Sequence, residues 1–484
     1  MPASPSTARA INDRLALRLL QQEGPLTAGQ LKQLTGLSRP TVADLVERLT
    51  ASGLITVVGE SGEQRRGPNA RLYGIVADRA HLAALDVRTE GVSVMVSDLL
   101  GRVLAEASVP IGGDTGTGPA VEQAVALVER VAKEAGAMGM PPRERVRARG
   151  RLHTVGIGAP GLIDPVTGEL RDSTGLPEWH RRLVAALQER LPSARVIVEN
   201  ETNLAALAEQ RDGAARDRDT FVLLWLGHGT GAAVVLDGTL RRGASGGTGE
   251  IGFLPVPGTG ALPTATDCAG GFHSLAGSAA VVELAGEYGL REEGVGAGPE
   301  PAAAELVRAA VAEAVGAGAG AGAGGGRAEG VDAGGAQAED AAATGPDAAG
   351  TPGAEAGGED VPEADDARRA DSAPGAGASA PGAVRSASHP ARAVRFLDAL
   401  ADRLAIGVAS VVAVLDPGCV VLGGEVGQAG GDVLAARVAE RIRRMSPLPT
   451  EVRASALGGG AVLRGALLTA RDRAQDELFA PPER

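Results

Sequence analysis

Three polar side chains in the middle of the chain have the chemistry needed to bind a hydroxyl-rich small molecule: Asn200, Glu201 and Glu250. An amide both donates and accepts hydrogen bonds and a carboxylate accepts them, so together they can match the hydroxyl groups of a sugar. If such a ligand binds in a cleft, the three side chains should converge on one polar volume. A second interpretation stays open for Asn200 and Glu201, in which they only cap the helix that begins near Thr202.

The N-terminal segment has side chains suited to contacting DNA. Ser38 can cap a helix, and side chains in the first turns of that helix would reach base edges in the major groove. These side chains are Arg39, Pro40, Thr41 and Asp44. A polar loop over residues 59–70 would contact phosphates or the minor groove. The contacting residues of this loop are Arg65, Arg66 and Asn69.

Short helices and two strands would position these side chains. Apolar residues at helical spacing predict a first helix, and Thr27 with Gln30 forms the capping box of a second helix. The helix after the tight turn is followed by strands over residues 54–58 and 71–75, which flank the polar loop. This order of elements predicts a winged helix-turn-helix over residues 1–78.

The charge of the chain is unevenly distributed. Residues 1–75 hold nine Lys or Arg and six Asp or Glu, a net charge of +3, whereas the whole chain carries −13. Positive charge is therefore concentrated in the segment that would meet phosphates, and this favours DNA binding. The other use of a winged helix, pairing with another protein chain, stays open.

Behind this segment, strand and helix patterns alternate from His81 to Gly238, which predicts an α/β architecture. Residues 85–98 and 226–237 resemble each other, since each has a strand, a Thr-containing turn and a second strand that ends in an Asp turn. A repeated hairpin of this kind predicts a duplicated fold of two lobes with a cleft between them.

Residues 316–390 have a different composition from the rest of the chain. Of these 75 residues, 24 are Ala and 18 are Gly, and twelve acidic and four basic residues give a charge of −8. Such a segment cannot bury a core, so we expect a disordered insert in the second lobe. The insert would divide the two-lobed domain into residues 79–315 and 391–484.

Composition also argues against several classes of protein. Two cysteines, Cys268 and Cys419, cannot build a disulfide framework, which favours a cytoplasmic location. The first ten residues lack the apolar core of a signal peptide, and no long uncharged apolar stretch follows, so we expect no membrane segment. The negative net charge argues against a chain that coats nucleic acid along its whole length.

Four motifs, in this order along the chain, resemble those of the ROK family of repressors and sugar kinases. They are GIGAPGLID at 156–164, VENETN at 198–203, GASGGTGEIG at 243–252, and DP followed by VVLGG within 416–424. With the predicted helix-turn-helix in front, the chain is similar to the repressor branch of that family. The resemblance implies an actin-like, ribonuclease-H-like ATPase fold for the two-lobed domain. It also implies operator DNA and a small sugar-like effector as partners, a homo-oligomer, and repression of transcription.

The chain departs from the kinase members that it resembles. Their first phosphate loop has the form Asp-x-Gly-Gly-Thr, whereas residues 86–91 have the sequence DVRTEG. Arg88 thus replaces a glycine, and Glu90 adds a carboxylate where a polyphosphate would lie. The family's catalytic base is the Asp of an Asn-Asp pair, and Glu201 has an extra methylene that displaces this carboxylate. We therefore expect no enzyme activity and no cofactor.

Positions that hold zinc or sugar in the family also differ here. The zinc-site His is replaced by Phe253, and Cys268 with His273 cannot close a tetrahedral site. We therefore expect no metal, and we expect Cys268 to be a small buried apolar side chain. Gly175 stands where the family usually has Asn, and we expect Trp179 to pack against its helix.

Taken together, these patterns favour a DNA-binding transcriptional regulator with a catalytically inactive, sugar-kinase-like domain for effector sensing and oligomerisation. Two alternatives stay open. One is an active ATP-dependent sugar kinase. The other is a ligand-independent DNA-binding oligomer, in which the large domain serves only for assembly.

Overall fold

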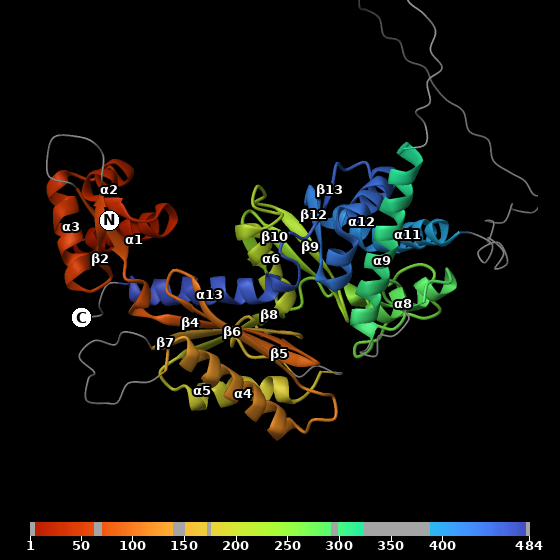
Figure 1. Ribbon diagram of the computed structural model, residues 1–484, viewed down its shortest axis with the longest axis horizontal. Helices are drawn as coiled ribbons and strands as arrows, with labels where there is room; N and C mark the ends of the chain where they lie inside the picture. Colours follow the sequence, from red (N-terminus) through yellow and green to blue (C-terminus); the bar gives the residue numbers. More distant parts are fainter. Residues whose placement is uncertain are drawn as a thin grey trace, which may run out of the picture.

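The computed structural model describes residues 5–61, 70–138, 151–171, 176–291, 299–323 and 388–480. A small helical unit lies at one end, a sheet covered by helices lies next to it, and a second sheet with its helices lies at the other end (Figure 1). Strands and helices alternate along the chain behind the first unit, so the predicted α/β architecture is confirmed.

The N-terminal unit is a winged helix-turn-helix, as predicted. Its elements are α1 (Pro5–Glu23), β1 (Leu26–Thr27), α2 (Ala28–Thr35), α3 (Arg39–Ala51), β2 (Ile55–Ser61) and β3 (Ala70–Ile75). The strands form one sheet in the order β1-β3-β2. Thr27 and Gln30 form the predicted capping box of α2, and Ser38 caps α3 by accepting a hydrogen bond from the Thr41 N–H at 3.3 Å. Local hydrogen bonding of this kind fixes where each helix begins.

The first lobe is a five-stranded sheet with helices on both faces. Its strands are β4 (His81–Arg88), β5 (Gly91–Asp98), β6 (Val103–Pro110), β7 (Leu152–Ala159) and β8 (Arg195–Asn200), in the order β6-β5-β4-β7-β8. Figure 1 shows α4 (Thr117–Glu134) and α5 (Trp179–Arg190) on one face and α13 (Ala461–Leu478) on the other. Because both faces are covered, β4 is almost completely buried.

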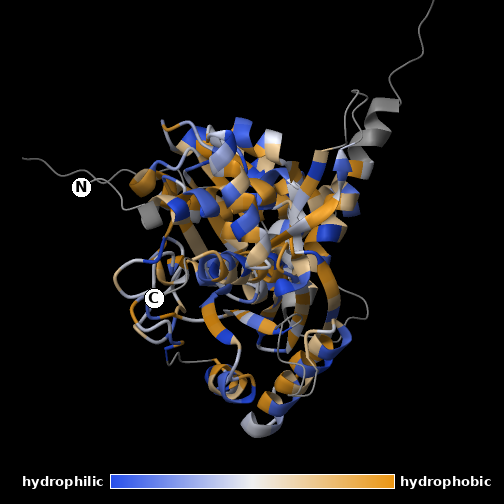
Figure 2. Ribbon diagram, turned by 90° about the vertical axis from the view of Figure 1, so that its left-hand side faces the viewer, coloured by the Kyte–Doolittle hydropathy of each residue, from blue (hydrophilic) through white to orange (hydrophobic). Residues whose placement is uncertain are grey.

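The second lobe repeats this plan. Its strands are β9 (Phe221–Leu226), β10 (Thr230–Leu236), β11 (Thr239–Arg241), β12 (Cys419–Gly423) and β13 (Glu451–Ala454), in the order β11-β10-β9-β12-β13. The helices are α6 (Glu201–Asp212), α7 (His273–Ala276), α8 (Ser278–Glu287), α9 (Pro299–Ala323), α11 (His389–Leu415) and α12 (Gly424–Met445). Hydrophobic and hydrophilic residues are interspersed along the helices in Figure 2, as expected when one face of each helix covers a sheet.

The predicted repeat of a hairpin in the two lobes is confirmed. β4 pairs antiparallel with β5, with Arg88 opposite Gly91 at the turn, and β9 pairs antiparallel with β10, with Leu226 opposite Thr230. A winged helix-turn-helix followed by a two-lobed domain of the actin-like type is the fold class that the sequence predicts.

Helix α13 approaches its neighbours closely because glycines leave room for its backbone. A Cβ atom on Gly156 of β7 would lie 2.5 Å from the carbonyl oxygen of Ala466 in α13. A Cβ atom on Gly465 of α13 would lie 2.0 Å from the carbonyl oxygen of Leu204 in α6. Side chains at these two positions would force the elements apart. The two glycines therefore allow α13 to pack tightly against both β7 and α6.

The expected limits of the domains fall at identifiable elements. The limit after residue 78 lies within a short 3-10 helix, Ala77–Arg79. Helix α9 continues past residue 316 to Ala323, and α11 begins at His389, so both helices enter the segment that we expected as an insert. The rest of that segment, residues 324–387, lies outside the described residues. Among the helices that are described, none is long and apolar enough to cross a membrane.

Candidate functional site

Asn200 connects the end of β8 to the beginning of α6. Its side-chain oxygen accepts hydrogen bonds from the N–H groups of Thr202, at 2.9 Å, and Asn203, at 3.2 Å, so it caps α6. Its side-chain amide donates to the carbonyl oxygen of Gly161 at 3.2 Å and to Oε2 of Glu201 at 2.7 Å. The predicted capping role is therefore confirmed, and the same cap fixes the amide beside the carboxyl group of Glu201.

Glu201 is the first residue of α6 and lies close to other carboxyl groups. Burial raises the pKa of Glu201 to about 8, the carboxylates of Asp86 and Glu250 act in the same direction, and Arg88 opposes them. These four side chains therefore share one electrostatic environment. A carboxyl group with this pKa is mainly protonated at neutral pH, so it can donate as well as accept a hydrogen bond.

Glu250 reaches this environment from the loop that follows β11. Its side chain is exposed, but the protein around it shields the carboxylate enough to raise its pKa. Arg242 of the same loop donates through Nε to Oε2 of Glu199 at 2.6 Å, and Glu199 directly precedes Asn200 in β8. This ion pair anchors the Glu250 loop to the strand end that carries Asn200 and Glu201. Neither Glu199 nor Arg242 was predicted as a site residue from the sequence.

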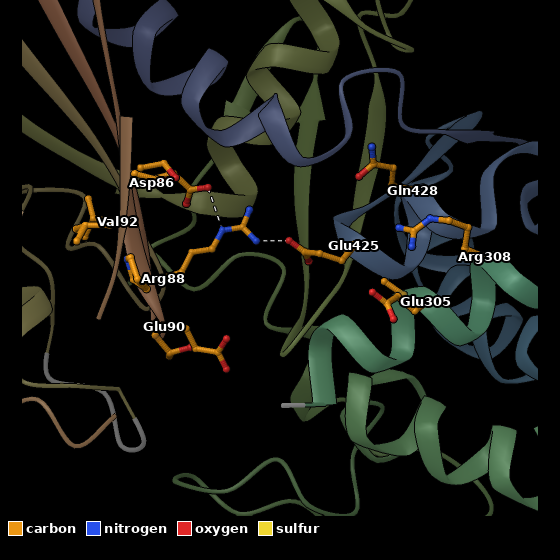
Figure 3. A pocket seen from close by; sticks show the side chains of 15 residues that line it. Asp86, Arg88, Glu90, Val92, Glu305, Arg308, Glu425 and Gln428 are labelled. Carbon is orange, nitrogen blue, oxygen red and sulfur yellow. Dashed lines mark hydrogen bonds and ion pairs between the residues drawn. The ribbon is translucent and has the colours of Figure 1, made fainter. Parts of the chain in front are cut away.

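Arg88 bridges the two lobes at the position of the first phosphate loop (Figure 3). Its Nε donates to Oδ2 of Asp86 in β4 at 3.0 Å, and its Nη1 donates to Oε1 of Glu425 in α12. Burial disfavours the charged guanidinium, but the two carboxylates outweigh this effect and raise the pKa of Arg88. Glu425 lies 337 positions from Arg88 in sequence, in no motif that the sequence analysis identified.

A cavity of about 530 Å³ opens beside this bridge and is lined by both lobes. Its charged lining residues, all labelled in Figure 3, are Asp86, Arg88, Glu90, Glu305, Arg308 and Glu425. Four carboxyl groups thus face two guanidinium groups. This excess of carboxyl groups opposes the binding of a polyphosphate, which is itself an anion.

The backbone of Arg88 is supported from behind by His180. Nε2 of His180 lies 3.3 Å from the carbonyl oxygen of Arg88, and its ring meets that of Trp179 edge to face at 4.2 Å between centroids. Burial lowers the pKa of His180 to about 4, so the ring is neutral and can donate to this carbonyl. Trp179 is only 3% exposed and belongs to the apolar core of the first lobe, which confirms that it packs against the fold.

Cys268 and His273 follow Glu250 along the chain, Cys268 in a loop and His273 as the first residue of α7. Cys268 is only partly buried, so our expectation of a buried apolar side chain was wrong. It lies in a loop of mainly exposed residues, which leaves its sulfur without a complete apolar shell. The part of the chain that the structure describes contains no group of three or more His, Cys, Asp or Glu side chains that could hold a metal ion. Gly175, the departure from the family's sugar-contacting Asn, lies outside the described residues.

The candidate DNA-binding residues of α3 lie at its N-terminal end. Arg39, Pro40 and Asp44 are exposed, whereas Thr41 is partly buried. Asp44 forms an ion pair with Arg48 one turn further along the helix, and Arg48 also pairs with Asp13 of α1 at 2.6 Å. The Asp44 carboxylate is therefore already paired with Arg48 of the same helix. Arg39 is the exposed cation in the first turn of α3. The predicted wing contacts, at positions 65, 66 and 69, lie outside the described residues.

Comparison with known families separates the chain into two matched parts. The model of the ROK family matches residues 143–285 and 379–473, and the model of the MarR family matches residues 11–67. The first match includes Asn200, Glu201, Glu250 and Glu425, but not Asp86, Arg88, Glu90, Glu305 or Arg308. The second includes α2, α3 and the larger part of α1.

Among curated proteins, the chain is similar to two bacterial regulators. It is 27% identical over 252 residues to the DNA-binding transcriptional dual regulator NagC of Escherichia coli (strain K12), and this match covers 51% of this chain and 58% of NagC. It is 24% identical over 255 residues to the xylose repressor of Bacillus subtilis (strain 168), and this match covers 52% of this chain and 62% of the repressor. The matched region thus spans about six tenths of the length of these relatives.

Solved structures share the fold. A ROK family transcriptional regulator, described as a homologue of the E. coli MLC protein, matches 98% of both chains with a TM-score of 0.64 and 18% identity. The ROK hexokinase from Thermus thermophilus matches 82% of this chain and 99% of its own length, with a TM-score of 0.51 and 23% identity. The first of these similarities includes the N-terminal unit.

Proposed function

We propose that the chain is a transcriptional regulator whose two-lobed domain senses a sugar-like small molecule, because its N-terminal part matches the MarR family model and its two-lobed part matches the ROK family model. Relatives named as repressors support repression as its mode of action. The DNA-binding residues are Arg39, Pro40, Thr41, Asp44, Arg65, Arg66 and Asn69. The effector-binding residues are Asn200, Glu201 and Glu250.

The observation that carries DNA binding is the exposed first turn of α3. Arg39 is the first residue of this helix, and its charge is not neutralised by either carboxylate that pairs with Arg48. A recognition helix inserts this end into the major groove, where an Arg can bind a guanine through two hydrogen bonds. A homo-oligomer would place two such helices on the two halves of an operator.

The observation that supports a polyol effector is the pair of carboxyl groups of Glu201 and Glu250, which lie outside the lining of the cavity beside the Arg88 bridge. The Glu201 carboxyl group is mainly protonated at neutral pH and is held by a hydrogen bond from the Asn200 amide, and Glu250 contributes an exposed carboxyl group. A ligand with several hydroxyl groups both donates and accepts, so it matches such a set. Polar groups that lose their partners when a ligand lacks the matching hydroxyl groups discriminate between such ligands.

We propose further that the cleft does not transfer phosphate. A kinase must position and neutralise the ATP phosphates with backbone N–H groups and cations. At the corresponding loop, the Arg88 guanidinium is already engaged by Asp86 and Glu425. The cavity beside it carries more carboxyl groups than guanidinium groups. These features favour a sensor over a sugar kinase.

Genome-wide footprinting of the purified protein is the experiment that tests this proposal. We expect a short set of strong sites that share one sequence, and the genes next to them define the class of sugar to be screened. A panel of sugars is then added to the protein bound to its best site, and DNA release is followed by fluorescence anisotropy. Equal binding to the best site and to a scrambled sequence would contradict the proposed function. Strong site-specific binding that no sugar alters would favour the ligand-independent oligomer.

A further inference from the structure

Three charged side chains form a continuous chain across the cleft: Asp86, Arg88 and Glu425. Asp86 and Arg88 lie near the end of β4 in the first lobe, and Glu425 lies in α12 of the second lobe. Their side chains are 5%, 34% and 20% exposed, so the bridge is largely shielded from solvent. It is the guanidinium that joins the lobes, because it donates to a carboxylate on each of them.

Glu425 has a special position in the second lobe. It is the acidic residue in the first turn of α12, next to the Gly423–Gly424 step from which this helix begins. Gly424 has a φ of +74°, and a Cβ atom there would lie 2.4 Å from the carbonyl oxygen of Leu226, so this step requires glycine. The helical segment that begins at this step is short, because the φ of +50° and ψ of −151° at Gly431 interrupt α12.

The order of charges therefore matches that of a bound metal–phosphate complex. In such a complex a protein carboxylate holds a cation, and the cation holds a phosphate. Here the Asp86 carboxylate holds the Arg88 guanidinium, and the guanidinium holds the Glu425 carboxylate. We propose that Arg88 and Glu425 are an internal substitute for a metal–phosphate pair, which holds the two lobes together without any nucleotide.

The surroundings of Arg88 support a fixed rather than an incidental bridge. The carbonyl oxygen of Arg88 is held by His180, so the backbone that carries the guanidinium is anchored in the core of the first lobe. Oδ1 of Asp86 is buried and accepts no hydrogen bond from any residue that the structure describes, which makes the guanidinium at Oδ2 the partner of this carboxylate. A buried carboxylate without its cation is costly, so Asp86 favours retention of Arg88 in this position.

Lobe closure can be measured independently of the proposed DNA binding. Closure is measured as the distance between two spin labels on outer helices, at Lys133→Cys in α4 and Glu287→Cys in α8. Both positions are exposed, and the partly buried native thiol is removed by Cys268→Ser. Double electron–electron resonance then gives the distribution of distances in the full chain, with and without millimolar Mg²⁺ and a non-hydrolysable ATP analogue.

The parent protein is expected to give one narrow distribution that the nucleotide does not change. Arg88→Met keeps most of the side-chain volume but removes the charge, and Glu425→Gln keeps the shape but removes the carboxylate. Each variant is expected to shift at least half of the population to longer distances. Arg182→Ala is the matched control, because Arg182 forms an exposed ion pair with Glu178 within the first lobe alone, and it should leave the distribution unchanged.

Two results would overturn the proposal. One is a distribution in Arg88→Met and Glu425→Gln that coincides with that of the parent protein, provided that both variants keep the parent's circular dichroism spectrum. The other is a broad distribution in the parent protein that narrows when the nucleotide and Mg²⁺ are added. If Arg88→Met alone fails to fold, the distance distribution of Glu425→Gln still tests the proposal, because this variant changes only the second lobe.

Discussion

Gln475, near the end of α13, donates a hydrogen bond to the side-chain oxygen of Gln21 in α1 at 2.9 Å. The same amide donates to the carbonyl oxygen of Leu99 in the first lobe at 3.2 Å. In the turn before α13, the N–H of Gly459 donates to Gln428, which lines the cavity of the cleft. A single helix thus contacts the winged domain at one end and leads back to the cleft at the other.

We predict that Gln475→Ala weakens the effect of the effector on DNA binding. Signals between two sites require an element whose arrangement both sites influence. Helix α13 contacts the winged domain through Gln475, and through Gly465 it packs against α6, the helix that begins at Glu201. The factor by which a saturating sugar lowers operator affinity should fall at least threefold, whereas affinity without sugar should change by less than twofold. Anisotropy titrations with and without the sugar from the screen measure both values. Asp476→Ala, on the exposed side of the same helix, is the control, and an equal loss in both variants would contradict a specific role for Gln475.

Arg39→Ala should lower operator affinity by about 1–3 kcal/mol and relax the preference at one base pair, because an Arg that binds a base edge carries sequence information. Arg65→Ala should weaken binding to operator and scrambled DNA alike. It should also reduce the slope of log K against log salt concentration by about one, as expected for the loss of a phosphate contact. Titrations at several salt concentrations, on the operator and on single-base variants, separate the two effects. Equal losses on all sequences for Arg39→Ala would show that it contacts only the backbone of DNA.

Local features of the fold were predictable from sequence because they depend on neighbours a few residues apart. The capping box of Thr27 and Gln30 and the Asn200 cap of α6 are hydrogen bonds between residues no more than three positions apart. The repeated hairpin was visible because its strands and turns follow one another directly. The α/β pattern and the winged helix follow from such signals.

Contacts between distant segments were not predictable in the same way. Glu425 meets Arg88 only after two lobes have folded and closed on each other, and Arg242 meets Glu199 only when a loop of one lobe covers a strand of the other. The extension of α9 past residue 316 was missed because the segment is rich in Ala and Gly, and that composition also matches the disordered segment we expected. The burial of Cys268 was predicted from its residue type alone, and residue type does not determine how far a loop residue is buried.

No phosphoryl transfer from ATP to hexoses, pentoses or their N-acetyl forms should be measurable above background. Arg88, in the segment that resembles the family's first phosphate loop, is held by Asp86 and Glu425. Glu201, at the position that the resemblance assigns to the base, is mainly protonated at neutral pH. A protonated carboxyl group cannot accept the proton of the attacking hydroxyl. A coupled assay for ADP with each sugar is the measurement. Turnover of about 1 per second or faster, which is ordinary for an enzyme, would refute this prediction.

The free energy of unfolding should fall as the pH rises through 8, in part because of Glu201. Its pKa is raised from 4.5 to about 8 in the folded chain, so the neutral form is favoured by folding. The stabilisation is therefore complete below about pH 4.5 and is lost as the carboxyl group ionises on the way to pH 8 and above. Glu201→Gln, which cannot ionise, should flatten the decline between pH 6 and 9 in urea unfolding. Glu283→Gln, an exposed change on α8, should leave the slope as it is, and an identical slope in all three proteins would contradict the assignment.

Glu250→Ala should abolish sugar-induced release from DNA while leaving operator affinity unchanged. Glu250 approaches the cleft on a loop tied to Glu199 through Arg242, and its carboxyl group influences the titration of Glu201, so it belongs to the same polar volume. A coupling of about 1–3 kcal/mol gives a 5–150-fold change in affinity, and losing one charged hydrogen-bond acceptor is enough to remove it. Glu106→Ala, an exposed change on β6, should behave like the parent protein. If Glu250→Ala still releases DNA at the same sugar concentration, the effector does not contact this carboxylate. If no sugar releases the parent protein from DNA either, a ligand-independent role for the large domain gains support.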